Sequence, residues 1–408
     1  MLGKKKDILF LCQFFHPEYI SSAQLPYETL LSLVDAGFQV GALCGYPHEY
    51  TTQKEIPTDE VINGIEVKRL KYLQLDRSGF VGRLVNYFSF TLMVFLNLWR
   101  LAAYKTVVVY SNPPILPWIV SWAKPLFGCR FVFVSYDLYP EVATVTNTLR
   151  DGSMICRLME HINKVVFRRA DRVVALSQEM KDYIAANRNI APEKITVIPN
   201  WYADREVSRR CRKDTRFYDL VGDKFVVSYF GNMGTMQDMQ TIVQTIRILK
   251  DAKEIFFLFA GHGNKMEKLK EIVREENLEQ VKIYDFLHGQ DFQDALSISD
   301  CAFVSLERGA TGLCVPSKTY SYMMQGIPLV AIMDESDIVR DIEAGAGVWV
   351  RNGESEKLAA LLRSLHADEE KTKQMRKTCR QLYLQKYTAP ICTGKYVDLF
   401  RQIMENKG

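Results

Sequence analysis

The segment GATGLCVPSKTYSYMMQGIPLVA, residues 309–331, places a serine and a lysine at the start of a short helical pattern. Ser317 is positioned to N-cap a helix over Lys318–Gln325, and Gly326 can end that helix in a left-handed turn. The first N–H groups of a helix lack partners within it and attract anions, and Lys318 adds a full positive charge. This pattern predicts a site for an anion such as a nucleotide diphosphate. The alternative is a capped helix with a solvent-facing lysine.

Three further turns each follow an apolar, strand-like run. Their candidate ligand-binding residues are Gly231, Asn232, Gly234, Gln237, Gly261, Gly263, Phe286 and Leu287. Glycine lets a backbone approach a ligand closely, but neither glycine turn has the G-x-G-x-x-G spacing of a dinucleotide fingerprint. Each glycine turn alone is better explained as a tight strand-to-helix connection. At the carboxyl edge of one parallel sheet the turns meet in one crevice, so together they predict a ligand site.

The first half of the chain offers fewer candidates. Asp137, in SYDLYPE, can orient or deprotonate a hydroxyl group, or it caps a loop. His16 contacts a ligand or simply occupies the first loop, which continues into Ser21 and Ser22. The nine cysteines include no C-x-x-C pair and no zinc-like spacing with histidine, which favours free thiols in a reducing cytoplasm. No Asp-rich motif is present, and we expect no metal and no other cofactor.

These residues need a framework that holds strand ends side by side. Short apolar runs rich in β-branched and aromatic residues are typical of strands buried on both faces of a parallel sheet. They are Ile8–Cys12, Phe38–Leu43, Thr106–Tyr110, Arg130–Ser135, Arg172–Leu176, Phe225–Phe230, Ile255–Ala260, Val281–Tyr284, Cys301–Ser305, Leu329–Met333 and Gly347–Val350. Helix-period stretches lie between them, for example Gln24–Ala36, Met154–Ala170 and Met239–Leu249. The alternation occurs twice, which predicts an α/β protein with two doubly wound, Rossmann-like units.

The length of 408 residues suits two or three domains. The first unit closes near residue 200, a polar stretch follows over 204–218, and Phe225 opens a new strand. We therefore predict an N-terminal domain over 1–200 and a C-terminal domain over 201–387. A final helix over 388–408 is predicted to pack back on the N-terminal domain.

The positive charge is uneven. Residues 1–199 carry 22 Lys and Arg against 18 Asp and Glu, whereas residues 200–408 carry 30 of each. This excess is too small for nucleic-acid binding but suits a face near anionic lipid, unless it is ordinary scatter. Residues 84–99 contain no charge and are bracketed by Arg83 and Arg100. They are short for a membrane span, which needs about 20 apolar residues, and predict a buried helix, an in-plane interfacial helix or a groove for a lipid-linked substrate.

In their order along the chain, these motifs resemble retaining glycosyltransferases of family 4, which have the GT-B fold. The matching motifs are IPN (198–200), FGNMG, FAGHG, DFLHG, ALSISDCAFVSL and VPSKTYSYMMQGIPLVA, with HPEYISSAQLPYETLLSLVDAGFQV and SYDLYPE in the first half. The Val-Pro-Ser-Lys motif is similar to that of a subset building bacterial surface polysaccharides, among them N-acetylfucosamine transferases. The resemblance implies two Rossmann-like domains facing across a cleft, with the donor held by the second. It adds Pro316, Ser317, Lys318 and Ser321 to the donor-binding residues.

The sequence departs from the family pattern at two acids. The family has a pair of glutamates with seven residues between them, and here Leu313 and Ser321 occupy those positions. The second glutamate normally holds the ribose, and Ser321 offers only a weaker hydrogen bond. Glu307 is the nearest acid upstream. The family's Arg/Lys pair is also not seen, since Gly234–Gln237 contains no cation.

The resemblance implies transfer of a sugar from a nucleotide-diphosphate sugar to a lipid-linked or glycan acceptor, with front-face attack and retained configuration. Lys318 would stabilise the leaving diphosphate, Asp137 would act on the acceptor hydroxyl, and Glu307 is the third catalytic candidate. His16, Ser21 and Ser22 would contact the acceptor or simply form part of the first loop. We expect a UDP-linked donor, no nucleic-acid partner, and a cytoplasmic protein at the inner face of the membrane. The alternative is a non-catalytic GT-B-like partner of another transferase; a sugar-nucleotide epimerase would need acids and a histidine that cannot be placed here.

Overall fold

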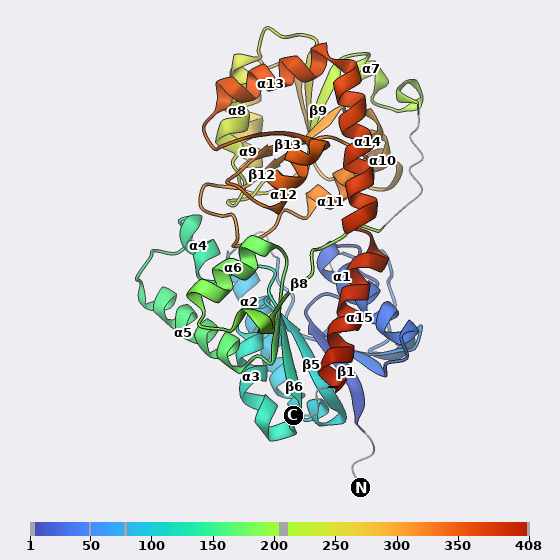
Figure 1. Cartoon of the computed structure of the whole chain (residues 1–408), viewed down its shortest axis with the longest axis vertical. Helices are drawn as coiled ribbons and strands as arrows, with labels where there is room; N and C mark the ends of the chain where they lie inside the picture. The colour runs from blue at the N-terminus through green and yellow to red at the C-terminus, as the bar shows by residue number, and fades with distance from the viewer. Residues whose placement is uncertain (1–4, 49, 77–79, 204–210, 406–408) are drawn as a thin grey trace.

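The computed structural model describes residues 5–48, 50–76, 80–203 and 211–405. Two domains lie one above the other, each built on its own sheet (Figure 1). The polar stretch predicted between them, over 204–218, falls partly outside the described residues, which resume at Cys211. The strand β8 ends the first sheet and β9 opens the second.

The N-terminal sheet has eight strands in the order β3-β4-β2-β1-β5-β6-β7-β8. All its pairings are parallel except that of β3 with β4. The strands are β1 (Lys6–Cys12), β2 (Val40–Gly45), β3 (Asp59–Ile62), β4 (Ile65–Leu70), β5 (Tyr104–Tyr110), β6 (Arg130–Val134), β7 (Arg172–Ala175) and β8 (Ile195–Val197). The helices are α1 (Ser21–Asp35), α2 (Phe80–Phe95), η1 (Leu98–Ala103), α3 (Leu116–Phe127), α4 (Glu141–Val145), α5 (Met154–Arg169), α6 (Gln178–Asn187) and η2 (Pro192–Lys194).

The C-terminal sheet has six parallel strands in the order β11-β10-β9-β12-β13-β14. They are β9 (Phe225–Asn232), β10 (Ile255–His262), β11 (Val281–Tyr284), β12 (Cys301–Ser305), β13 (Leu329–Ile332) and β14 (Gly347–Val350). The helices are η3 (Arg212–Asp214), α7 (Tyr218–Val221), α8 (Met239–Ile248), α9 (Met266–Glu275), α10 (Gly289–Ile298), α11 (Lys318–Met324), α12 (Asp337–Asp341), η4 (Ile342–Ala346), α13 (Ser355–Ala367), α14 (Glu369–Lys386) and α15 (Ala389–Glu405).

Helices cover both faces of each sheet, so the strands are buried on both sides and need no alternation of polar and apolar residues. The prediction of two doubly wound α/β units is confirmed. In the N-terminal domain one face packs against α2, α3, α5 and α6, and the other against α1 and α15. The last helix, α15, runs beside α1 at the N-terminal domain (Figure 1), and its Phe400 ring lies 6.4 Å from the Phe10 ring of β1.

The hairpin of β3 and β4 was not predicted. Its two-residue turn, Asn63-Gly64, has both φ angles positive (48° and 81°), and Asn-Gly is the dipeptide most favoured in such turns. β3 is a short, half-exposed edge strand, and β4 alternates apolar and charged residues over 65–68, so both lack the apolar run by which the other strands are recognised. The turn dipeptide was therefore the available signal.

The uncharged segment 84–99 forms most of α2 and the start of η1. One face of α2 is buried, with Asn86, Phe90 and Val94 each at most 1% exposed. The other face is exposed, so the segment combines the features of the buried and interfacial alternatives. None of the helices in the described ranges is both long and apolar enough to cross a bilayer.

Candidate functional site

The predicted site lies at the carboxyl edge of the C-terminal sheet. Strands β9 and β10 pair in parallel up to their last residues, with Gly231 opposite Gly261 and Asn232 opposite His262. The neighbouring strands β11 and β12 run in the same direction. Because parallel strands end at one edge, the turns after all four strands are brought together, as the sequence predicts.

The glycines of these turns are required by the close approach of the two chains. A Cβ atom on Gly261 would lie 1.9 Å from the carbonyl oxygen of Gly231, and one on Gly263 would lie 2.4 Å from that of Met233. Gly261 and Gly263 also have φ angles of +150° and +130°, which side chains other than glycine rarely adopt. The glycines therefore pack the two turns against each other, and the edge they form is rigid and made largely of backbone.

Lys318, the first residue of α11, points at this edge. Its ammonium group lies 3.6 Å from the centre of the Tyr229 ring and donates a hydrogen bond of 3.2 Å to the carbonyl oxygen of Asn232. Its Cε atom would be 3.8 Å from a Cβ on Gly231. Burial lowers the pKa of Lys318 well below its usual value, because it disfavours the charged form. An anion in front of the turn would favour the charged form again.

The other residues of the opening motif have mainly structural contacts. Ser317 occupies the N-cap position but has helical backbone angles and makes no side-chain cap hydrogen bond, so the predicted side-chain cap is wrong. The helix ends at Met324 rather than Gln325, and Gly326 follows in the left-handed conformation (φ 61°), as predicted. The Ser321 hydroxyl donates to the carbonyl oxygen of Lys318 at 2.8 Å. Pro316 lies directly before this turn and is buried.

A second lysine supplies the cation that residues 234–237 lack. Lys265 donates to the carbonyl oxygens of Thr235 (3.2 Å) and Gln237 (2.7 Å) and forms a 2.5 Å ion pair with Glu307. Glu307 is therefore held against the β9 turn rather than free in the cleft. The Gln237 side-chain oxygen accepts from the Gly234 N–H at 2.9 Å and closes the same turn. The sequence signal for Lys265 was its position two residues after Gly263, in the glycine turn at the end of β10.

The third predicted turn divides into an exposed and a buried residue. Phe286 is 50% exposed and stacks on His262 and on His288, with ring centres 5.4 Å and 4.8 Å apart. Leu287 is 8% exposed and belongs to the core of the domain, so its side chain does not face the cleft edge. Burial, and then the charge of Lys318, lower the pKa of His262. His262 and Phe286 are thus part of the same surface as Lys318.

Asp137 lies in the loop that follows β6 of the N-terminal domain. Its N–H and that of Tyr136 donate to the Ser111 hydroxyl at 3.3 Å and 3.0 Å, which fixes the loop after β6. Burial raises the pKa of Asp137 to about 6. The next residue, Leu138, donates its N–H to the carbonyl oxygen of Leu313 at 2.9 Å, so the loop reaches across to the segment before α11.

The first-loop residues lie on the N-terminal domain. The His16 ring stacks on Tyr27 at 4.3 Å, and burial, then the Arg69 charge, lower its pKa. Ser21 and Ser22 form the first turn of α1, and Ser21 is exposed. Tyr19 of the same loop contacts the His288 ring of the other domain, with ring centres 5.9 Å apart. The structure therefore brings the first loop, though not His16 itself, to the aromatic stack.

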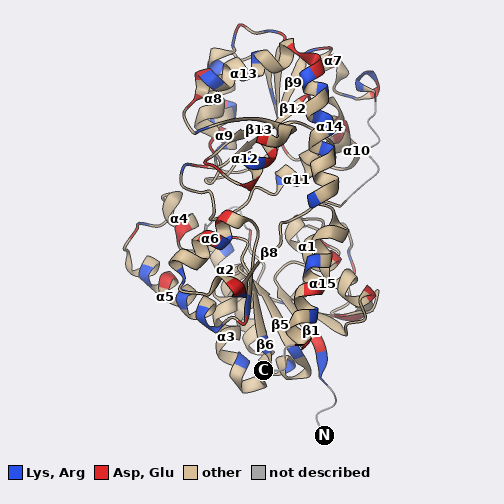
Figure 2. Cartoon of the chain, viewed as in Figure 1, with Lys and Arg blue, Asp and Glu red and all other residues tan. Residues whose placement is uncertain are grey.

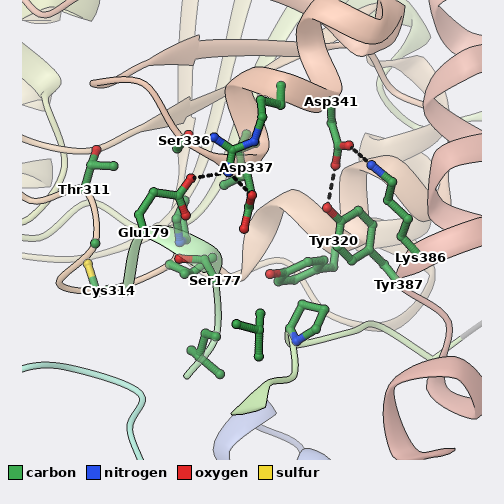
Figure 3. Close-up of a pocket in the computed structure, with 18 of the residues that line it drawn as sticks. Ser177, Glu179, Thr311, Cys314, Tyr320, Ser336, Asp337, Asp341, Lys386 and Tyr387 are labelled. Atoms are coloured by element: carbon green, nitrogen blue, oxygen red, sulfur yellow. Dashed lines mark hydrogen bonds and ion pairs between the residues drawn. The ribbon is translucent and has the colours of Figure 1, made fainter. Parts of the chain in front are cut away.

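A cavity of about 410 Å³ lies between the domains beside the segment before α11 (Figure 3). Of the predicted site residues it contains Pro316, whereas Lys318, Asp137 and the glycine turns lie outside it. Most of its charged groups pair with one another: Asp341 accepts from Lys386 and from the Tyr387 hydroxyl, both at 2.5 Å, and Arg340 contacts Glu179 at 3.3 Å. The cavity is therefore separate from the predicted donor site.

Among the described residues, one group brings three side chains of metal-binding type within 4.8 Å, namely Asp151, Cys156 and Glu160. It lies at and just before the start of α5, and the Cys156 thiol already donates to both carboxylates. All nine cysteines are free, as expected from their spacing.

Family models match both halves of the chain. Residues 27–201 match a glycosyl transferase 4-like domain, and residues 212–382 match glycosyl transferases group 1. Over 241 residues the chain is 29% identical to the probable glycosyltransferase WbjE of Pseudomonas aeruginosa, covering 58% of this chain and 60% of that protein. It is 22% identical over 183 residues to the putative colanic acid biosynthesis glycosyl transferase WcaI of Escherichia coli K12, covering 43% and 44%. The matches thus span about half the length of these relatives.

Solved structures show the same fold. Anabaena HepE, crystallised in complex with UDP and glucose, superposes with a TM-score of 0.71 at 17% identity, covering 97% of this chain and 99% of that one. WaaG, a glycosyltransferase involved in lipopolysaccharide biosynthesis, has a TM-score of 0.69 at 12% identity, covering 98% and 100%. With two Rossmann-like sheets and both domain models matched in order, the chain belongs to the family 4 type of glycosyltransferases with the GT-B fold.

Proposed function

We propose that this glycosyltransferase is a retaining, metal-independent enzyme that moves a sugar from a UDP-linked donor to a lipid-linked or glycan acceptor in bacterial surface polysaccharide or glycoconjugate synthesis. The single observation that carries the proposal is the Lys318 ammonium. It lies against the backbone of the β9 turn, where two glycine turns pack closely against each other. This is a cation poised for a diphosphate.

The chemistry follows from where charge develops. Breaking the sugar–phosphate bond places negative charge on the departing diphosphate and positive charge on the anomeric carbon. Lys318 and the N–H groups of the turns are fixed before the reaction, so they stabilise the diphosphate without reorganising. Lys265 contributes by holding the β9 turn in place through Thr235 and Gln237.

Asp137 is the group we assign to the acceptor hydroxyl. A carboxylate with a pKa of about 6 is ionised at neutral pH and is still basic enough to accept a proton as the bond forms. In front-face attack Asp137 would accept the proton of the hydroxyl as its oxygen bonds to the anomeric carbon and the sugar–phosphate bond breaks. Lys318 would balance the negative charge left on the departing diphosphate.

Two comparisons support the choice of donor and pathway class. HepE was solved in complex with UDP and glucose, and WcaI is described as a colanic acid biosynthesis enzyme. The Val-Pro-Ser-Lys motif favours an N-acetylated sugar, as in the N-acetylfucosamine transferases that the sequence resembles. We further propose that the enzyme works at the cytoplasmic face of the membrane, where a lipid-linked acceptor would be available.

A second candidate function is a non-catalytic GT-B-like partner of another transferase. The observation that favours it is Leu313, which stands where the family has a glutamate and is 3% exposed in an apolar environment. No carboxylate can act from that position. Sugar transfer therefore has to be measured directly, because nucleotide binding alone fits both functions.

The test is a thermal-shift panel with UDP, GDP, dTDP, CDP and ADP on the wild type and on Lys318→Ala. At a concentration 100 times Kd, a bound nucleotide stabilises the folded state by about 2.7 kcal/mol. We expect a shift with UDP that Lys318→Ala loses. Lys282→Ala is the matched control. Lys282 is exposed, and its ammonium also lies over a tyrosine ring, 5.7 Å from the centre of the Tyr284 ring.

Three outcomes separate the candidates. A UDP shift together with hydrolysis or transfer of a UDP-sugar, both lost in Lys318→Ala, supports the enzyme. A UDP shift without turnover of any UDP-sugar supports the non-catalytic partner. An equal shift in the wild type and in Lys318→Ala contradicts the assignment of Lys318 to the diphosphate.

A further inference from the structure

Exposed apolar side chains gather on one layer of the N-terminal domain. Of the 19 large apolar residues that are exposed in the described part of the chain, 14 lie on α2, η1, α3 and α5 or in the segments joined to them. They are Leu73, Leu75, Val81, Leu84, Phe88, Leu92, Phe95, Leu96, Trp99, Trp122, Leu126, Met154, Ile155 and Leu158. We call this set with its helices the apolar layer. Scattered apolar residues are ordinary on a protein surface, but a contiguous group of this size marks an interaction surface.

The central element of the layer is α2. Val81, Leu84, Phe88, Leu92 and Phe95 are spaced by three or four residues, so they form one face of the helix, and they are 40–67% exposed. No charged residue interrupts this face. At about 1.5 Å per residue, the stripe extends over roughly 20 Å along the helix.

The opposite face of α2 is firmly anchored, which sets the orientation of the stripe. Asn86 is 1% exposed, accepts from the Leu75 N–H and donates to the Leu75 carbonyl oxygen, both at 2.8 Å. Phe90 packs edge-to-face on Tyr72, with ring centres 5.4 Å apart. The helix therefore cannot rotate its apolar stripe into the core, and the exposure follows from the fold.

The neighbouring helices extend the same surface. α3 packs against both η1 and α5. Trp122 and Leu126 are exposed on α3, and Met154, Ile155 and Leu158 are exposed on the first turns of α5. The layer is thus formed by four helical elements, α2, η1, α3 and α5, on one side of the sheet.

The layer is also strongly cationic. The ranges 80–103, 116–127 and 154–169 contain seven Lys and Arg (Arg83, Arg100, Lys124, Arg157, Lys164, Arg168 and Arg169) and one acid, Glu160. Seven minus one gives +6, more than the +4 of the whole chain. Figure 2 shows the cations spaced along α5. Arg100 lies 4.6 Å from the Trp99 ring and Arg169 lies 3.5 Å from the Trp122 ring, so charge and aromatic area are paired.

The stripe begins at the cleft side of the domain. α2 follows the carboxyl end of β4, and in a parallel sheet this is the edge that also carries the Asp137 loop. Burial raises the pKa of the nearby Tyr139, and the charges of Asp137, Tyr87 and Arg83 act on the same phenol. The first turn of α2 therefore lies close to the group assigned to the acceptor hydroxyl.

We propose that the apolar layer docks onto an anionic phospholipid bilayer, with α2 lying in the interface and the Asp137 loop at the level of the lipid headgroups. The proposal rests on the proposed function in one respect, since it assigns a lipid-linked acceptor to the Asp137 site. A surface that combines an apolar stripe, tryptophans and a net charge of +6 matches a negatively charged interface. Two copies of the layer facing each other would instead bring equal positive charges together.

The test is co-sedimentation of the full chain with vesicles of phosphatidylglycerol and phosphatidylcholine, against vesicles of phosphatidylcholine alone. Each Lys or Arg near an anionic surface strengthens the attraction, and salt screens it. We expect binding to the anionic vesicles that weakens more than tenfold in high salt, and little binding to the neutral ones. The triple variant Phe88→Ser, Leu92→Ser, Phe95→Ser should abolish binding to both.

Matched controls separate the surface from general stickiness. The variant Val61→Ser, Ile248→Ser, Leu384→Ser removes three exposed apolar side chains outside the layer and should bind vesicles normally. Arg157→Glu, Lys164→Glu, Arg168→Glu should lose anionic binding, whereas Lys253→Glu, Lys268→Glu, Lys377→Glu, on exposed lysines of the C-terminal domain, should keep it. The UDP thermal shift of each variant reports that it is folded.

The outcomes distinguish this proposal from the proposed function. Absence of wild-type binding to anionic vesicles, or equal losses in the layer variants and their controls, overturns the docking surface and leaves nucleotide binding untouched. A wild-type dimer that the Phe88, Leu92 and Phe95 substitutions convert to a monomer would replace the bilayer with a second copy of the chain. Vesicle binding without any nucleotide shift would instead contradict the proposed transferase.

Discussion

The N–H of Leu138 donates a 2.9 Å hydrogen bond to the carbonyl oxygen of Leu313, and this bond joins the two domains beside the candidate site. The Leu313 side chain is 3% exposed and packs with apolar residues of the N-terminal domain, although the residue belongs to the C-terminal one. The position where the family has a glutamate therefore works here as an interdomain contact.

Restoring an acid at position 313 should destabilise the folded protein. Leu313→Ala is expected to cost about 2–4 kcal/mol of unfolding free energy, the usual range for a buried leucine. Leu313→Glu should cost more at pH 8, because it buries an unpaired carboxylate. Burial raises the pKa of such an acid in the folded state, so its stability is retained at low pH and lost as the pH rises. Urea unfolding at pH 5 and pH 8 measures this difference.

The control for this pair is Leu384→Glu, at a position that is 44% exposed. It should change the unfolding free energy by less than about 0.5 kcal/mol at either pH. If Leu313→Glu is as stable as Leu313→Ala at pH 8, position 313 is open to solvent and the contact described above is not formed in solution.

Asp137 should set the acidic limb of the pH profile. Since its pKa is raised to about 6, transfer should increase from pH 5 to pH 7 as the carboxylate ionises. Asp137→Asn should reduce kcat by about 10²–10⁴-fold, the usual contribution of a general base, and should remove this limb. Measuring kcat against pH with a fixed donor tests both effects.

As the pH rises, the Asp137 carboxyl should lower the stability of the folded protein while it raises the activity. The folded-state pKa is above the unfolded value, so the wild type loses stability as the pH rises through about 6, whereas Asp137→Asn does not. The variant should therefore be the more stable protein at pH 8 and similar at pH 4. Equal stability profiles would show that the carboxylate is well solvated in the folded protein.

Lys318 should make nucleotide affinity depend on alkaline pH. Its pKa is lowered by burial, so the ammonium loses its proton at a lower pH than an ordinary lysine. The Kd for UDP should then increase as the pH rises through that lowered value. Lys318→Arg keeps its charge throughout, because arginine is always protonated, and its Kd should stay constant. Titration calorimetry between pH 6.5 and 10 compares the two; parallel slopes would assign the effect to another group.

Substitutions of Lys265 and of Glu307 should have different effects on UDP binding, although the two residues form one ion pair. Lys265 also bonds the carbonyl oxygens of Thr235 and Gln237, so Lys265→Met releases the β9 turn, whereas Glu307→Gln leaves those two bonds in place. Lys265→Met should weaken UDP binding by about tenfold or more, since each hydrogen bond from a charged donor is worth about 1.5–3 kcal/mol. Glu307→Gln should leave the Kd within about threefold.

Turnover then decides the role of Glu307. A fall in kcat with unchanged Kd in Glu307→Gln places this acid in the chemistry. Unchanged kcat limits it to holding Lys265. Equal losses of UDP affinity in both variants would contradict the view that Lys265 orders the turn independently of Glu307.

Some features followed from short stretches of sequence. The apolar runs and helix-period segments predicted the two α/β units because burial on both faces of a sheet depends on local pattern. Gly326 was correctly predicted to end α11, since a left-handed residue is a local requirement. The Ser317 cap failed because this residue has helical backbone angles, which its own sequence does not reveal.

The sequence by itself determined the fold class, the glycine turns at the strand ends and the motifs of the family, because each depends on neighbouring residues. Only the tertiary structure decided that Lys265 supplies the cation of the β9 turn and that Leu313 is buried against the other domain. It also decided which face of α2 is anchored and which is exposed. These depend on segments far apart in the chain meeting at one place, and a local pattern carries no information about that meeting.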